Sequence, residues 1–121
     1  MPQHNDEKSI HQLVEQFKAG AILYHQGLED EKLAVQRRGQ KAVLSAIQEL
    51  DAFGPEGRNN LIPLLDHPDP GVRVYAAGTL VKVIPERALA VLKEIDDFGM
   101  TRAHMTAFHM LWSHTHGGLK L

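Results

Sequence analysis

The chain has 121 residues, of which 43% are hydrophobic and 23% are charged, a composition typical of a folded domain and not of a disordered chain. It contains no cysteine, which excludes disulfide bonds, thiolate zinc sites and cysteine nucleophiles. Its formal net charge of −2 leaves no general excess of basic residues to neutralise phosphates, which argues against nucleic acids and anionic membranes as partners.

We expect no signal peptide and no membrane-spanning segment. The N-terminus is polar, and no apolar run approaches the roughly 18 residues that are needed to cross a bilayer. We therefore expect a cytoplasmic protein with no membrane association. Residues 1–121 are expected to form a single helical domain, with loose ends at 1–7 and 117–121.

The first segment with helical periodicity follows Ser9. Ser9 and Gln12 have the spacing of a capping box, and Gly27 is a natural helix stop, so we predict a helix between them. Its apolar stripe comprises Ile10, Leu13, Val14, Phe17, Ala21, Tyr24 and Leu28.

A second helix is predicted from a cap at Asp30 to about Leu50. It has two apolar faces, one large and one small, so we expect it to be central and packed on both sides. The large face carries Leu33, Leu44, Ile47 and Leu50, and the small face carries Val35, Gly39, Ala42 and Ala46.

Prolines divide the second half of the chain. A short helix is predicted over about residues 55–65, kinked by Pro63. Asp69 should cap the next helix and Pro70 should open it, and apolar residues around that helix indicate cover on both faces. They include Val72, Val74, Tyr75, Ala76, Leu80, Val81 and Val83.

Two further helices complete the predicted set of about six. Pro85 opens the fifth, whose stripe is Ala88, Leu89, Leu92 and Ile95, and after Gly99 the sixth runs from a cap at Thr101 to about Ser113. On the sixth helix we expect a buried face of Met105, Phe108, Leu111 and Trp112, with His104 partly buried inside that arc. His109 falls at its margin, and Met110 points away. Since no segment has a period-two pattern, the predicted fold is all-α.

The hexapeptide Glu49–Gly54 has a counterpart in Glu94–Gly99, and the apolar register before both segments matches. The second segment follows 45 positions after the first, and a period of this length is typical of HEAT and armadillo repeats. Residues 61–73 (LIPLLDHPDPGVR), followed by Ala76-Ala77 and Leu80, resemble a bacterial HEAT-like repeat. The whole chain is similar to a family of short bacterial HEAT-like proteins of unknown function. The resemblance implies a compact right-handed α-α superhelix that binds other molecules and has no assigned activity.

The histidines do not have the spacing of a metal site. His104, His109 and His114 are five residues apart, which turns each by about 140° from the last on an α-helix. They cannot converge on one ion, and His114 with His116 could form only an adventitious pair. We expect no metal and no cofactor.

One cluster of polar and basic residues is the candidate interaction surface. It comprises Gln36, Arg37, Arg38, Gln40 and Lys41. The simpler interpretation is a solvated face with glutamines at helix contacts. The alternative is a surface that meets an acidic partner, because arginine suits carboxylates and phosphates and is common at binding hot spots.

No nucleotide-binding loop and no nucleophile motif occurs in the sequence, so we expect no enzymatic activity and no catalytic residues. The leading hypothesis is a module that binds another protein, such as a toxin or an enzyme that it regulates, or a second copy of itself. A nucleic-acid binder that uses Arg37, Arg38 and Lys41 is one alternative. A pocket for a small ligand near Tyr24, Tyr75 and Trp112 is another.

Overall fold

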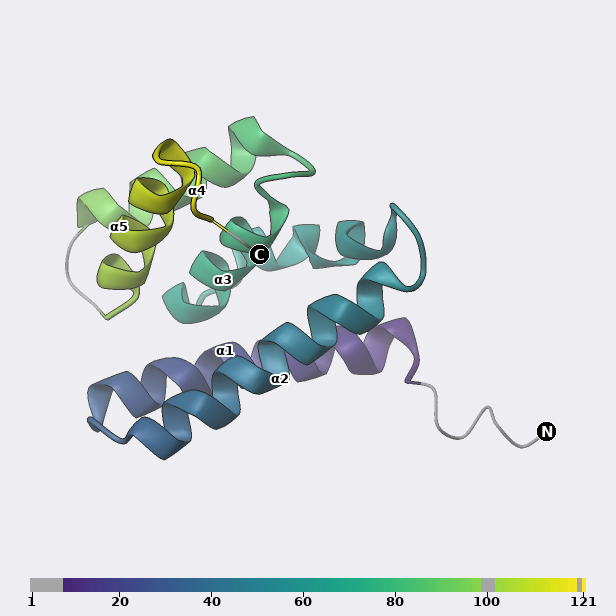
Figure 1. The fold of residues 1–121 in the computed structure, drawn as a ribbon, viewed down its shortest axis with the longest axis horizontal. Helices are drawn as coiled ribbons and strands as arrows, with labels where there is room; N and C mark the ends of the chain where they lie inside the picture. The colour runs from purple at the N-terminus through teal and green to yellow at the C-terminus, as the bar shows by residue number, and fades with distance from the viewer. Residues whose placement is uncertain (1–7, 99–101, 120) are drawn as a thin grey trace.

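The computed structural model describes residues 8–98, 102–119 and 121, and within those ranges the chain is helical, with no strand. In chain order the elements are α1 (Ile10–Glu29), α2 (Leu33–Asp51), the 3₁₀ helix η2 (Gly57–Asp66), α3 (Pro70–Leu80), α4 (Pro85–Phe98) and α5 (Arg102–Thr115) (Figure 1). The predicted all-α class is confirmed. No described helix has the combination of length and hydropathy that a membrane span requires.

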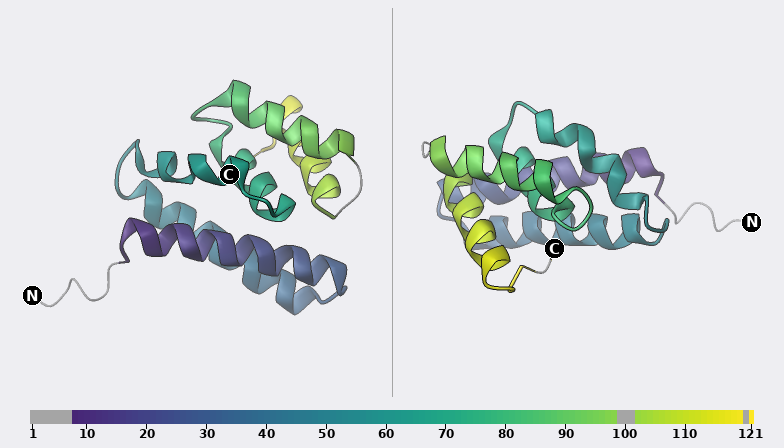
Figure 2. Two further views of the ribbon diagram at one scale, coloured as in Figure 1. Left: turned by 180° about the vertical axis from the view of Figure 1, so that it is seen from behind. Right: turned by 90° about the horizontal axis from the view of Figure 1, so that it is seen from above.

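The helices are stacked in three successive pairs (Figures 1 and 2). Helices α1 and α2 run side by side at one end of the molecule, η2 and α3 form the middle, and α4 and α5 lie at the other end. Helix α1 contacts α2, η2, α3 and α5, whereas α2 packs mainly on α1 and has a smaller contact with η2. The inner member of the first pair is therefore α1.

This arrangement corrects the prediction that the second helix is central and packed on both sides. Its small face packs against α1, where Gly39 and Ala46 are buried. On the large face only Ile47 and Leu50 are buried, while Leu33 is 56% exposed and Leu44 is 44% exposed. Burial therefore does not follow the predicted division into two faces, because Ile47 and Leu50 of the large face are buried together with Gly39 and Ala46 of the small face.

Glycines allow the close approach of α1 and α2. A Cβ atom on Gly39 would lie 2.4 Å from the backbone nitrogen of Tyr24, and one on Gly27 would lie 2.6 Å from that of Gln36. Gly27 therefore lies buried within α1, which continues to Glu29. The prediction that Gly27 ends this helix was wrong, because here the glycine serves a helix contact and not a turn.

The caps of the first two helices differ in how well the sequence predicted them. The capping box is confirmed: the Gln12 backbone N–H donates to Ser9 Oγ over 3.1 Å, and the Ser9 N–H donates to Gln12 Oε1 over 2.8 Å. Asp30, in contrast, is the C-cap of α1 and not the N-cap of α2. Glu31 follows in the left-handed conformation (φ 54°), and α2 begins after Lys32, whose side chain makes no capping hydrogen bond.

The proline-rich corner forms as predicted. Helix η2 contains Pro63 and adopts the 3₁₀ form. Asp69 Oδ1 accepts hydrogen bonds from the N–H groups of Gly71 and Val72, at 2.7 and 3.3 Å, and Pro70 is the first residue of α3. Helix α3 is covered on both faces, as expected, because it packs against η2, α4, α5 and α1. Its buried residues include Val72, Val74, Tyr75, Ala76, Ala77, Thr79 and Leu80.

The last pair and the end of the chain complete the core. Helix α4 buries Ala88, Leu92 and Ile95, as the sequence predicted. The expected break at Gly99 and cap at Thr101 lie outside the described residues. The segment after α5 is not wholly loose, because Leu119 and Leu121 pack against the core and Leu121 lies over Gly78 of α3.

Candidate functional site

Helix α5 presents large apolar side chains to the outside. Met105, Phe108 and Trp112 are 50%, 51% and 55% exposed, although the sequence predicted that they form the buried face. The residues that α5 buries are Ala103, Ala107 and Met110, which lie against α3 and α4. The prediction was wrong because two alanines let the α5 backbone approach its neighbours closely, which turns the larger side chains away from the core.

These three exposed residues form one continuous feature, which we call the α5 stripe. Their spacing of three and then four residues places them on one side of the helix. The flat ring of His116 stacks on Trp112, with ring centroids 3.9 Å apart, and extends the stripe by one turn. Single exposed hydrophobic residues are normal, but a row of two aromatic rings and a methionine is typical of a surface that binds another molecule.

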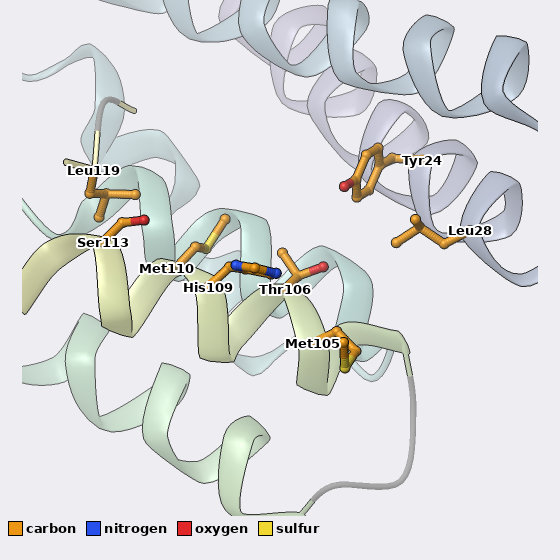
Figure 3. A pocket seen from close by; sticks show the side chains of 8 residues that line it. All are labelled: Tyr24, Leu28, Met105, Thr106, His109, Met110, Ser113 and Leu119. Carbon is orange, nitrogen blue, oxygen red and sulfur yellow. The ribbon is translucent and has the colours of Figure 1, made fainter.

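A cleft of about 380 Å³ lies beside the stripe, between α1 and α5 (Figure 3). Tyr24 and Leu28 face it from α1, and side chains of α5 face it from the opposite side. Met105 belongs to both the cleft and the stripe, so the two are continuous. The remaining lining residues are Thr106, His109, Met110, Ser113 and Leu119.

The small-ligand hypothesis placed Tyr24, Tyr75 and Trp112 together, and the structure brings together only the first two. Tyr24 lines the cleft, and its ring meets that of Tyr75 edge to face at 5.4 Å. Burial raises the pKa of both phenols, and that of Tyr75 is raised further by the nearby Tyr24. Trp112 is not part of the lining, because it lies on the outward face of α5.

A hydrogen bond joins the two walls of the cleft. The His25 ring on α1 lies with Nε2 3.1 Å from Thr106 Oγ1 on α5, and with Nδ1 2.9 Å from the Ala21 carbonyl oxygen. Since a carbonyl can only accept, Nδ1 donates, and in the neutral ring Nε2 accepts from the threonine hydroxyl. Burial lowers the pKa of His25, and the Ala21 hydrogen bond and the Asp69 charge oppose that shift.

The predicted interaction surface lies on α2. Arg37, Arg38, Gln40 and Lys41 are exposed on the side of the helix that faces away from α1. Gln36 does not belong with them, since it is partly buried and its Nε2 donates to the Gly27 carbonyl oxygen over 3.2 Å. Within the part of the chain that the structure describes, no carboxylate pairs with these three cations.

The histidines of α5 are separated from one another in the structure. His104 is partly buried, as predicted, but its Nδ1 lies 2.8 Å from the Asp96 carbonyl oxygen and 3.4 Å from Asp96 Oδ1. The partly buried His104 ring therefore has a carboxylate beside it. His109 and His114 are exposed. Among the described residues no three side chains of the metal-binding types gather at one point.

Fold and surface together define a class: an all-helical protein of three stacked helical pairs with an apolar stripe on its last helix. Comparisons with the sequence patterns of protein families and with the sequences of curated proteins give no match. Among solved structures, the chain is similar to the protein RPA1889 from Rhodopseudomonas palustris CGA009, with a TM-score of 0.83 at 22% sequence identity. The similarity covers 93% of each chain, and at this identity it establishes the shared fold alone.

Proposed function

We propose that the chain is a HEAT-like helical-repeat module that binds another protein and catalyses no reaction. The HEAT-like assignment is supported by the stacking of three helical pairs and by the Asp69–Pro70 start of α3. It does not draw on the match between Glu49–Gly54 and Glu94–Gly99. Those segments begin in the last turns of α2 and α4, which hold different positions in their respective pairs.

The α5 stripe is the observation that carries the binding proposal. Exposing half of Phe108 and Trp112 to water is unfavourable by roughly 25 cal/mol for each Å² of apolar surface, and a protein surface that covers them recovers this free energy. Protein interfaces are built around such aromatic anchors. In the adjacent cleft, Leu28 and Met110 offer apolar contacts for one side chain of a partner.

The test begins with capture of binding proteins from the native host, followed by titration calorimetry with the purified partner. Trp112→Ala and Phe108→Ala should each weaken binding by about 30-fold or more, which corresponds to the roughly 2 kcal/mol of a hot-spot residue. Leu33→Ala is the matched control, because Leu33 is an equally exposed hydrophobic residue on α2. Equal affinity of all three variants for the partner would contradict the proposal.

A second candidate is nucleic-acid binding through Arg37, Arg38 and Lys41. The observation in its favour is that all three are exposed on one helix without a carboxylate partner in the described ranges. The net charge of −2 opposes it, because the rest of the surface repels phosphates. A small ligand in the α1–α5 cleft is a third candidate, favoured by the cleft's volume and by its mixture of apolar and polar lining residues.

A further inference from the structure

We propose that two copies of this chain pair through their α5 stripes, with the two helices antiparallel about a twofold axis that passes between Phe108 and His109. The proposal rests on the function proposed above and names a second copy as a partner of the same stripe. Its basis is the order of residues along the stripe, the absence of charge there and the area that the stripe offers.

The order of residues makes the stripe complementary to itself. Met105 stands three positions before Phe108, and Trp112 stands three positions after His109. An antiparallel twofold axis between Phe108 and His109 therefore places Met105 of each copy opposite Trp112 of the other. The two Phe108 rings meet beside the axis. Sulfur–aromatic and aromatic–aromatic contacts are both favourable pairings.

The charge pattern permits this pairing on α5 and opposes it on α2. Residues 105–112, which carry the stripe, contain no aspartate, glutamate, lysine or arginine, so the stripe itself can be covered without burying a charged side chain; the one arginine of α5, Arg102, precedes the stripe by three residues. The outer side of α2 carries Arg37, Arg38 and Lys41, and a second copy placed there would bring like charges together. Of these two helix faces, α5 is the one that a copy of the chain can approach without repulsion.

The available area sets the strength of the pair. Met105, Phe108 and Trp112 are each about half exposed. With roughly 200 Å² for a large side chain, the stripe offers about 300 Å² per copy, or about 600 Å² for the pair. Stable interfaces bury roughly 1,200–2,000 Å² in total, so the stripe alone supplies less than a stable interface needs. The expected dimer is therefore weak and reversible, with a Kd above about 1 µM.

Sedimentation velocity at pH 8, where histidine is ordinarily neutral, tests whether the pair forms. Between about 1 µM and 1 mM, a range that begins at the lower bound of the expected Kd, the weight-average mass should rise from that of the 13.5 kDa monomer towards twice that value. Phe108→Glu and Trp112→Glu should remain monomeric throughout, whereas Leu33→Glu, at a similarly exposed position on α2, should behave like the natural chain. Because all three positions are exposed, circular dichroism should show that each variant retains its helices.

Single cysteines test the orientation, and the natural chain contains none to interfere. His109→Cys places a thiol beside the proposed axis, so mild oxidation should join two copies. In Met105→Cys the thiols of the two copies would lie about 10 Å apart along the helix direction, because each is between three and four residues from the axis and an α-helix rises 1.5 Å per residue. That exceeds the roughly 7 Å between Cα atoms that a disulfide can span, so this variant alone should not cross-link. Efficient cross-linking at Met105→Cys would indicate parallel helices and overturn the proposal.

A natural chain that stays monomeric up to 1 mM, or an association that Trp112→Glu leaves unchanged, would also overturn the proposal. The first result would leave the proposed function intact if a different protein still loses affinity for Trp112→Ala. If neither self-association nor a partner depends on Trp112, both proposals fail together. The two measurements thus separate a second copy from any other occupant of the α5 stripe.

Discussion

Replacement of Gly39 by alanine tests whether the close approach of α1 and α2 organises the first helical pair. A Cβ atom at this position would lie 2.4 Å from the Tyr24 nitrogen and 2.6 Å from the Gly20 carbonyl oxygen. Both are backbone atoms, so no side chain can rotate away to make room. The two helices would have to separate, and every contact along their interface would loosen with them.

Two opposing effects determine the sign of the change. Alanine is favoured over glycine inside a helix by about 1 kcal/mol, which would stabilise the variant if space were available. Overpacking in a rigid interior costs roughly 1–3 kcal/mol, and a clash with two backbone atoms belongs at the upper end. We therefore expect Gly39→Ala to lower the free energy of unfolding by about 2 kcal/mol.

Urea unfolding followed by circular dichroism measures this change. Gly118→Ala is the control with the same chemistry, because the nearest atom to its added Cβ, the Ser113 carbonyl oxygen, is 3.9 Å away. That control should change the free energy of unfolding by no more than about 0.5 kcal/mol. A Gly39→Ala variant that is as stable as the natural chain, or more stable, would refute the packing of α1 on α2 described above.

Three further predictions concern the core, pH and nucleic acid. Leu80 is fully buried, so Leu80→Ala should cost about 2–5 kcal/mol in urea unfolding, and a loss well below 1 kcal/mol would contradict its burial. Burial lowers the pKa of His25, so below about pH 6.5 the unfolded chain takes up a proton before the folded chain does. Stability should therefore be fully present above that pH and fall as the pH drops towards the folded pKa. In His25→Gln this decrease, followed by urea midpoints from pH 8 to pH 5, should be smaller, and an unchanged decrease would exclude His25 as its source. Duplex DNA should bind no more tightly than the non-specific range of about 10⁻⁴–10⁻⁶ M at physiological salt; a nanomolar gel shift that is lost in Arg37→Glu would instead favour the second candidate function.

The sequence predicted the local signals well. Ser9 with Gln12 and Asp69 with Pro70 define helix starts through hydrogen bonds between residues two or three apart, and both occur in the structure. The buried stripe of α4 was also predictable, because that helix has a single apolar face. In these segments the residues that decide the structure are close together in the chain.

Two local signals, Gly27 as a helix stop and Asp30 as the cap of the second helix, were wrong. The other errors arose where a helix has two apolar faces. Periodicity shows which residues share a face, but it does not show which face meets the next helix. On α2 both faces were expected to be packed, but Leu33 and Leu44 of the large face are exposed, whereas Gly39 and Ala46 of the small face are buried. The predicted interaction surface included one residue that does not belong to it. Gln36 is turned towards α1, where its side chain donates a hydrogen bond to the Gly27 carbonyl oxygen. Only knowledge of the neighbouring helix could have settled these choices.

The error with the largest consequence for the proposed function concerns the orientation of α5, because this orientation leaves the α5 stripe exposed. The close packing of Ala103 and Ala107 against α3 and α4 is one cause of the observed orientation, in which Trp112 is 55% exposed. Two hydrogen bonds to other elements favour it: Thr106 with His25 on α1, and His104 with the Asp96 carbonyl oxygen on α4. These bonds fix which side of α5 faces inward and leave the aromatic side to the outside. Since the histidine and the threonine are 81 residues apart, no local pattern could have predicted their pairing. A helix held in this way keeps its stripe exposed in the single chain, and in the function that we propose a partner that covers the stripe would recover the free energy that folding alone leaves unused.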